Sequence, residues 1–430
     1  MTHAAQPAAQ LGLWRVLAYG VPGLPLALMG IPLYVYLPPF YANELGLGLA
    51  AVGLALMLTR FWDVITDPLV GFLSDRIPGR HRRKLLMATG IPLLVASLWF
   101  LLRPGEGVGL WHLYLWGLAA FLGWTLIQIP YTSLGAEADP TPHGRTRLAA
   151  SREGLALVGT VLAASLPVLL GSEAPADVLK AVFWLMAVLL PLGFLVMGLG
   201  TPEPATHRPV ADWRHGWPLI RHNRHLRGLL GGYFLNNLAN GIPAALFLMF
   251  VADRLDAENW LGPLLLYFAA GIAALPAWTW AARRIGKRRA WGLSILLAAV
   301  SFAFAPLLGP GDAVWFAVIC AVSGLSLGAN MVLPASIQAD IAGMDSDAGG
   351  GDRAGLFFGL LGLATKLALA VAVGLGFGVL SAAGFEAGDA DTTALALAYG
   401  ALPVAFKLAA AWLVLSILTD TEPPPREAMP

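Results

Sequence analysis

Two aspartates, Asp63 and Asp67, lie four residues apart inside the apolar stretch LTRFWDVITDPLVG. On a helix, residues at this spacing share one face, so the two carboxylates would lie close together. Away from water they repel each other, and either a bound cation or a proton on one carboxyl relieves the repulsion. Carboxylate oxygens suit hard cations. The alternative is a structural ion pair of Asp63 with Arg60, but one arginine cannot neutralise two acids.

Three further polar residues interrupt apolar stretches of the first half. Thr125 and Gln128 lie three residues apart within WTLIQIPYTSL and share a helix face. The hydroxyl can complete a cation shell and the amide can bind a polar substrate, or each can simply bond a neighbouring helix. Arg152, within RTRLAASREG, either donates paired hydrogen bonds to substrate hydroxyls or anionic groups, or extends its head to the membrane interface.

The second half carries amides and a lysine in equally apolar surroundings. The stretch FLNNLANGIP contains Asn236, Asn237 and Asn240, which predict a polar surface facing a cavity, with helix–helix hydrogen bonding as the alternative. Lys366 in GLLGLATKLALAV has no acid within reach on its own helix, so it needs a partner on another helix. The two aspartates of the first half are the candidates.

The composition shows what must position these residues. The chain has 430 residues, of which 57% are hydrophobic and 12% charged, and its mean hydropathy is +0.69. An ordinary soluble domain is about 45–50% apolar and about 25% charged. So little polar surface requires lipid as the main solvent, and unalternated apolar runs indicate helices rather than a barrel. The expected fold class is an all-α membrane protein.

Apolar runs of about 20 residues are long enough to span a membrane, and twelve are predicted. A polar, histidine-containing segment separates six spans from six, which predicts an N-terminal bundle at 1–200, a cytoplasmic linker at 201–227 and a C-terminal bundle at 228–430. The predicted spans are 13–40, 48–74, 84–103, 108–134, 151–171, 178–200, 228–252, 259–282, 288–309, 312–340, 354–383 and 393–418.

Basic residues concentrate in alternate connections, such as DRIPGRHRRK and ARRIGKRR, and the other connections carry acids instead. Because cytoplasmic loops are rich in Lys and Arg, both termini are expected in the cytoplasm. The first ten residues lack Lys and Arg, so the first apolar run is expected to be a span rather than a signal peptide. The single cysteine, Cys320, excludes an internal disulfide and is expected to be buried.

No HExxH motif, Gly-rich phosphate loop or nucleophile–base pair is present, so an enzyme is not expected. No cofactor is predicted, and no metal beyond a coupling cation. The histidines of the linker region match no standard zinc spacing; they are His207, His215, His222 and His225. Two aromatic residues near the polar positions, Tyr34 and Trp124, are predicted stacking platforms for a substrate, whereas most tryptophans anchor at the interface.

The stretch GFLSDRIPGRHRR, residues 71–83, resembles the loop motif between the second and third helices of the major facilitator superfamily. The resemblance implies the major facilitator fold, with twelve transmembrane helices in two six-helix halves. It also implies a conformational latch formed by Gly71, Asp75, Arg76 and Arg80. Asp75 would hold cytoplasmic helix ends together through charge and helix-dipole contacts.

The stretch from Arg60 to Asp67-Pro68 and Gly71 resembles the melibiose-permease-like, glycoside–pentoside–hexuronide:cation symporter family. YVYLPPFY, IQIPYTSL, RTRLAASR, LPASIQADIAG and GDRAG extend the likeness over most of the chain. By this resemblance Asp63, Asp67 and Thr125 match cation-site positions, Arg152 matches the sugar-contacting arginine and Lys366 the helix-11 lysine. Together with the residues argued from their positions, the predicted cation site is Asp63, Asp67, Thr66 and Thr125. The predicted substrate-binding residues are Gln128, Arg152, Tyr34, Trp124, Asn237, Asn240 and Lys366.

Three positions depart from the family pattern. The acid that binds sugar in helix 1 of melibiose permease falls near Ala27, within PLALMG, and is absent, and the acid in helix 4 is replaced by Gln128. Thr66 stands where that permease has a cation-site asparagine. Animal relatives that carry lysophospholipids likewise keep the cation acids and lack the sugar acids. A galactoside substrate and sodium selectivity are therefore both open.

The sequence predicts a secondary transporter that couples Na+ or H+ movement to symport of a small organic solute, for example a glycoside, by alternating access. A lysophospholipid or other amphiphile transporter, and a proton-driven exporter, are the alternatives. The expected protein is a monomer in a bacterial cytoplasmic (inner) membrane, with membrane lipid around it, a small-molecule substrate and no nucleic-acid partner.

Overall fold

The computed structural model describes residues 11–203, 223–257, 261–350, 353–385 and 391–416, apart from the single positions 80, 106, 140 and 173. In this part of the chain the ordered elements are all helical and no strand is present. The all-α class predicted from composition is confirmed. In helix α4 (Leu49–Arg76), the structure describes only the backbone at several positions, among them 60 and 63.

The chain forms two compact units. Unit 1 is Met1–Ala211 with Ala342–Gly359, and unit 2 is Asp212–Ile341 with Leu360–Pro430. The stretch Ala342–Gly359 lies in the predicted C-terminal half but packs within unit 1, where Asp75 and Arg145 contact it. The boundaries predicted for the two bundles and the linker stay a prediction.

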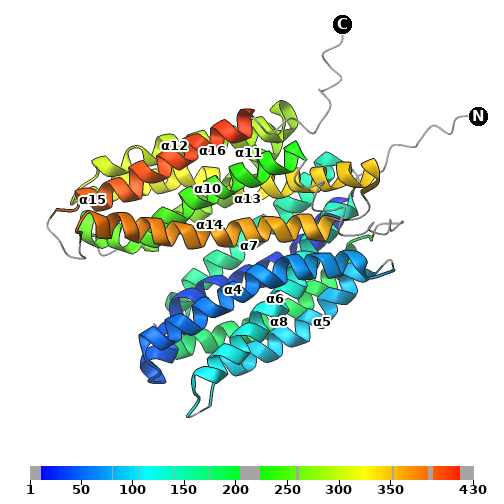
Figure 1. Ribbon diagram of the computed structural model, residues 1–430, viewed down its shortest axis with the longest axis horizontal. Coiled ribbons are helices and arrows are strands. Elements are labelled where there is room, and N and C mark those ends of the chain that lie inside the picture. The colour runs from blue at the N-terminus through cyan, green and yellow to red at the C-terminus, as the bar shows by residue number, and fades with distance from the viewer. Residues whose placement is uncertain are drawn as a thin grey trace, which may run out of the picture. The chain divides into compact units, whose positions relative to one another are not determined.

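The elements of unit 1 run in chain order along the N-terminal half (Figure 1). They are α1 (Leu13–Gly20), α2 (Gly23–Leu28), η1 (Pro32–Tyr36), α3 (Leu37–Pro39), η2 (Phe40–Glu44), α4 (Leu49–Arg76), α5 (Arg82–Leu102), α6 (Leu110–Ala138), α7 (Pro142–Leu170) and α8 (Pro175–Gly200).

The remaining elements follow the linker. They are α10 (Arg224–Met249), η3 (Phe250–Arg254), α11 (Leu261–Ile285), α12 (Lys287–Phe302), η4 (Ala305–Leu307), α13 (Ala313–Asp345), η5 (Ser346–Gly350), α14 (Ala354–Ala382), α15 (Thr393–Ala396), η6 (Leu397–Ala401) and α16 (Leu402–Ser416).

Ten described helices are long and apolar enough to cross a membrane. The first predicted span is broken into short pieces between residues 13 and 44, where five prolines cannot donate backbone hydrogen bonds. The second predicted span corresponds to α4, a single helix of 28 residues.

Helix α7 begins nine residues before the predicted start at 151. Thr141 caps it, because its hydroxyl accepts from the Gly144 N–H at 3.0 Å, and Pro142 occupies the first helical position. Arg145 and Arg147, which the sequence places in a connection, therefore lie on the helix together with Arg152.

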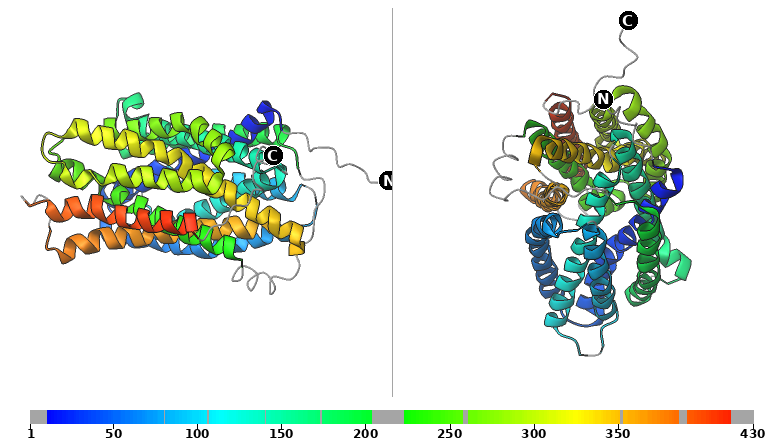
Figure 2. Two further views of the ribbon diagram at one scale, coloured as in Figure 1. Left: turned by 90° about the horizontal axis from the view of Figure 1, so that it is seen from above. Right: turned by 90° about the vertical axis from the view of Figure 1, so that its right-hand side faces the viewer.

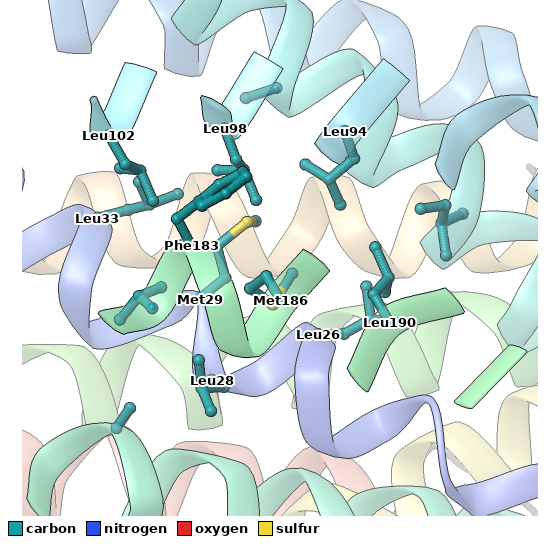
Figure 3. Packing of buried hydrophobic residues seen from close by; sticks show 14 of the residues in the cluster. Leu26, Leu28, Met29, Leu33, Leu94, Leu98, Leu102, Phe183, Met186 and Leu190 are labelled. Carbon is teal, nitrogen blue, oxygen red and sulfur yellow. The ribbon is translucent and has the colours of Figure 1, made fainter. Parts of the chain in front are cut away.

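The core of unit 1 lies between α5, α8 and the broken first segment (Figure 3). Leu94, Leu98 and Leu102 recur at every fourth residue of α5 and pack against Phe183 and Met186 of α8. All five side chains are buried. A helix with an apolar stripe at this period buries it against its neighbours.

Glycines allow α2 to approach α7 closely. A Cβ at Gly23 would lie 2.5 Å from the Arg152 carbonyl oxygen, and one at Gly159 would overlap the Leu24 carbonyl oxygen. Small residues at helix contacts are how transmembrane helices pack tightly without a hydrophobic driving force.

In unit 2, α16 packs along both α10 and α12, and Figure 2 shows the same helices from two further directions. Phe250 and Tyr399 stack with ring centroids 4.0 Å apart beside Phe316. Cys320 is buried in this apolar cluster, as expected from the sequence.

We expect Gly159→Val to lower the melting temperature of the purified protein, because the added methyl groups have no space against α2. Overpacking of this kind costs about 1–3 kcal/mol. Gly198→Val on α8 is the matched control, since a Cβ there meets no atom within 4 Å. Tryptophan fluorescence during heating measures both, and equal shifts would contradict the close packing of α2 and α7.

Candidate functional site

Asp67 is the best-defined candidate cation ligand. Its side chain is 1% exposed in the middle of α4, and the Thr125 hydroxyl on α6 donates to its Oδ1 at 2.9 Å. Thr125 is fully buried. A carboxylate and a hydroxyl held together away from water provide oxygen ligands of the kind that hard cations prefer. The structure therefore brings two of the four predicted cation ligands into contact.

Of the other two, Thr66 is buried beside Asp67 in the α4 sequence. The side chain of Asp63 lies outside the described residues, as do those of Arg60 and Tyr34. The predicted pairing of the two carboxylates and the alternative ion pair with arginine both stay predictions. Within the described chain, no group of three or more His, Cys, Asp or Glu side chains is placed to hold a metal ion.

Arg152 is buried within unit 1. The residue is 6% exposed, its Nε donates to Glu153 Oε1 at 2.9 Å, and its guanidinium lies beside Tyr19 and Tyr131. Those two tyrosines are linked reciprocally, because each hydroxyl donates to the other's backbone carbonyl, at 3.1 and 2.6 Å. The substrate role of Arg152 and the interface alternative both stay predictions.

The other predicted substrate residues of unit 1, Gln128 and Trp124, are half-buried on α6. They lie on the helix that carries Thr125, at positions three residues after it and one before it. They are therefore close in sequence to the candidate cation ligand, but their role in binding stays a prediction.

Of the three asparagines of α10, Asn236 follows the helix–helix alternative most clearly. Asn236 is 1% exposed and donates to Asn330 Oδ1 on α13 at 3.2 Å, which is helix–helix bonding rather than a cavity surface. Asn237 and Asn240 are half-buried. Lys366 is half-buried on α14, and its predicted pairing with the aspartates of α4 stays a prediction.

Several buried polar residues of unit 2 were not singled out from the sequence. Lys407 on α16 is 1% exposed and donates to Asn240 Oδ1 at 2.6 Å. Lys287 on α12 forms an ion pair with Asp340 on α13 at 2.5 Å. An isolated lysine inside an apolar run, as in LPVAFKLAAAW, is a signal that could have identified Lys407.

Asp75 at the end of α4 caps the first turn of α14. Its two oxygens accept from the backbone N–H groups of Gly355 and Leu356, both at 2.9 Å. A carboxylate is favoured at a helix N-terminus because the exposed N–H groups and the dipole are positive there. Gly71 permits this approach, since a Cβ at Gly71 would overlap the Gly355 carbonyl oxygen.

The charge of Asp75 is balanced by an arginine that was not among the predicted latch residues. Arg83 donates to Asp75 at 2.6 Å and to Glu137 at 2.5 Å, and Arg82 donates to Glu137 at 3.1 Å. Arg82 and Arg83 are buried although they lie in the basic connection. Of the predicted residues, Arg76 stacks over Phe72 at 4.2 Å, and Arg80 lies outside the described residues.

Long apolar helices that enclose charged and amide side chains define a polytopic helical membrane protein with the architecture of a transporter. Residues 18–418 match the family described as MFS/sugar transport protein, and the chain belongs to that family. The predicted membership in the major facilitator superfamily is thereby confirmed. The protein is an integral membrane transporter of this superfamily.

Curated relatives match nearly the whole chain. The sphingosine-1-phosphate transporter MFSD2B of Mus musculus is 26% identical, over 90% of this chain and 85% of its own length. The sodium-dependent lysophosphatidylcholine symporter 1-A of Danio rerio is 22% identical, over 92% of this chain and 83% of its own. The sodium-dependent lysophosphatidylcholine symporter 1 of Gallus gallus is 24% identical, over 88% of this chain and 80% of its own length.

Solved structures share the fold. A bacterial homologue of the iron transporter ferroportin in an outward-facing state gives a TM-score of 0.70 at 16% identity, covering 93% of this chain and 98% of its own. The Escherichia coli fucose:proton symporter gives 0.69 at 14% identity with the same coverage. At these identities the likeness establishes the fold alone.

We expect Thr125→Val to raise the sodium concentration for half-saturation of the purified protein by about tenfold, because loss of one oxygen ligand costs roughly 1.4 kcal/mol. Binding of radioactive sodium measures the effect without any substrate. Thr132→Val is the matched control on the same helix, since the Thr132 hydroxyl bonds only carbonyls of its own helix, those of Gln128 and Ile129. An unchanged sodium affinity in Thr125→Val would contradict the assignment.

We expect Asp75→Ala to destabilise the folded protein by about 1–3 kcal/mol, because two capping bonds to a charged group are lost and Arg83 loses an anion. Thermal unfolding of the purified variant measures this. Glu44→Ala, at an exposed carboxylate at the end of η2, is the control and should leave the melting temperature unchanged. A melting temperature of Asp75→Ala equal to that of the control would show that the cap contributes nothing.

Proposed function

We propose that this protein is a sodium-coupled symporter of an amphipathic lipid with one acyl or sphingoid chain. The observation that carries the coupling is the buried pair of Asp67 and Thr125, whose oxygens meet at 2.9 Å inside an apolar helix bundle. An ionisable group at that depth is costly, so its retention indicates a role in ion movement.

Sodium rather than a proton is the proposed ion. A hydroxyl beside a carboxylate adds a ligand for a metal cation, whereas a proton carrier needs only the carboxyl itself. The relatives described as lysophosphatidylcholine symporters are sodium-dependent, which supports the same choice.

The substrate class rests on two observations. The family's sugar-binding acid of helix 1 falls near Ala27, where PLALMG contains no acid, and its acid of helix 4 is replaced by Gln128. Neither place carries a charge that could bind several sugar hydroxyls. The relatives that match over most of the chain are described as transporters of lysophosphatidylcholine and sphingosine-1-phosphate. An amphiphile therefore fits better than a glycoside.

The coupling step follows from electrostatics. A sodium ion at Asp67 and Thr125 removes the net negative charge of the site, so the loaded site no longer resists the change of conformation that carries it across the membrane. Asp75 at the α14 N-terminus, with Arg83 and Glu137 behind it, acts as a latch that forms in one state and opens in the other. The termini are proposed to lie in the cytoplasm of a bacterial cell.

The test is uptake by proteoliposomes that contain the purified full chain. We expect an inward sodium gradient to drive labelled lysophosphatidylcholine into a pool that external albumin cannot extract. Asp67→Asn should abolish the sodium dependence, and Glu44→Gln, at an exposed position, should not. Equal drive by a proton gradient alone would overturn the choice of ion. Uptake of a methyl glycoside without lysolipid would overturn the substrate class, and gradient-independent flux would indicate a channel.

A further inference from the structure

One face of α10 presents polar groups in a regular series. Tyr233, Asn237 and Asn240 recur at intervals of four and three residues, so they lie on one side of the helix, and all three are half-buried. The orientation of each asparagine amide decides which atom is presented at the accessible side. Its oxygen accepts hydrogen bonds, whereas its nitrogen donates them.

Lys407 decides the orientation of Asn240. The ammonium group of Lys407 lies 2.6 Å from the Asn240 oxygen. Lys407 belongs to α16, which packs along α10 (Figure 1). An ammonium can only donate, so the amide must turn its oxygen toward Lys407. The NH2 group of Asn240 is then directed away from Lys407 and remains able to donate. No described residue accepts from it.

Asn237 is oriented the opposite way. Its Nδ2 donates to the backbone carbonyl of Tyr233 at 2.8 Å. A carbonyl can only accept, so the amide nitrogen must face it and the oxygen is left as an acceptor. The Tyr233 hydroxyl is itself held by Thr365 of α14, which donates to it at 3.0 Å. Neighbouring positions of α10 thus present one donor and one acceptor.

A donor and an acceptor on residues three apart lie roughly 5–6 Å apart at their Cβ atoms, and their ends can converge on one small group. The group that matches is an alcohol hydroxyl, which donates one hydrogen bond and accepts another. A lipid with a single chain keeps such a hydroxyl on its backbone, whereas a diacyl lipid has an ester in its place. A glycoside carries the same group, so the chemistry alone does not separate the two sources.

We propose that Asn237 and Asn240 bind a free hydroxyl of the substrate, and that Lys407 is the positioning residue that fixes Asn240 as the donor. This inference rests on the proposed function, because it assumes that the transported molecule reaches the α10 face. It goes beyond that function by naming the substrate group that is recognised and by giving the buried lysine of α16 a role.

The transport test compares lysophosphatidylcholine with its analogue in which hydrogen replaces the backbone hydroxyl, in the same proteoliposomes. For the wild type we expect the analogue to have a KM about threefold to tenfold higher, the value of one or two neutral hydrogen bonds, with an unchanged maximal rate. In Lys407→Met the amide of Asn240 is free to turn, so the difference between the two lipids should shrink. Lys407→Arg, which also only donates, should restore it.

Lys180→Met is the matched control, since Lys180 is exposed on α8, and it should leave both KM values unchanged. If Lys407→Met slows both lipids equally and keeps their KM ratio, the lysine is merely structural and the proposal is wrong. If a methyl glycoside and its deoxy analogue show the ratio and the lipids do not, the hydroxyl site holds but its substrate is a sugar.

A wild type that transports no lysolipid would refute the proposed function but not the orientation of the amides. A stability test therefore examines the contact between Lys407 and Asn240 without any substrate. Asn240→Asp gives Lys407 an acceptor with full charge, so we expect its melting temperature to equal or exceed that of the wild type. In the Lys407→Met background the same change buries a lone carboxylate and should lower the melting temperature markedly. Equal effects of Asn240→Asp in both backgrounds would show that the lysine does not fix Asn240, and would overturn the proposal.

Discussion

Water is excluded from the hydrocarbon core of a membrane, so every polar group that the chain places there must find its partner within the protein. This constraint explains why the buried polar contacts join different helices. The Thr125 hydroxyl of α6 satisfies Asp67 of α4, Lys407 of α16 reaches Asn240 of α10, and Lys287 of α12 pairs with Asp340 of α13. Each such contact also fixes the rotation of the two helices about their axes.

The same constraint accounts for the end of α14. The first N–H groups of a helix lack partners within that helix, and burying them without acceptors would be costly. Asp75 accepts two of them, and Arg83 and Glu137 then balance the charge that this requires. Because Asp75 and Arg83 are both buried and in contact, the carboxylate cannot leave the helix end without breaking its bond to the arginine as well. The proposed latch role requires contacts that form and break together in this way.

The comparisons agree that the protein is a transporter, but the substrates named in them differ. The family description refers to sugar transport, whereas the curated relatives that match most of the chain are described as transporters of single-chain lipids. The proposed lipid substrate rests on those relatives and on the absence of the family's sugar-binding acids, which fall near Ala27 and at Gln128. The amide pair on α10 is proposed to bind a hydroxyl, a group that both substrate classes carry. The proposed cation ligands lie on α4 and α6, whereas this amide pair lies on α10.

The sequence by itself determined the solvent of the protein and its helical class, because composition and uninterrupted apolar runs depend only on residue type. The family was predicted from the resemblance of motifs such as GFLSDRIPGRHRR. It also identified Asp67 and Thr125, each by itself, as polar residues inside apolar stretches and therefore as candidates for a functional role. Only the tertiary structure showed that they touch, since they are 58 residues apart in the chain. It likewise showed that Arg152 lies beside Tyr19 and Tyr131, that Asn236 bonds Asn330 of α13 and that the first predicted span consists of short helical pieces. Lys407 was not singled out from the sequence, and Arg83 was not among the predicted latch residues. The sequence position of a lysine or arginine does not reveal which residue it will bond. The partner is set by helix packing, which brings together residues that no local pattern connects.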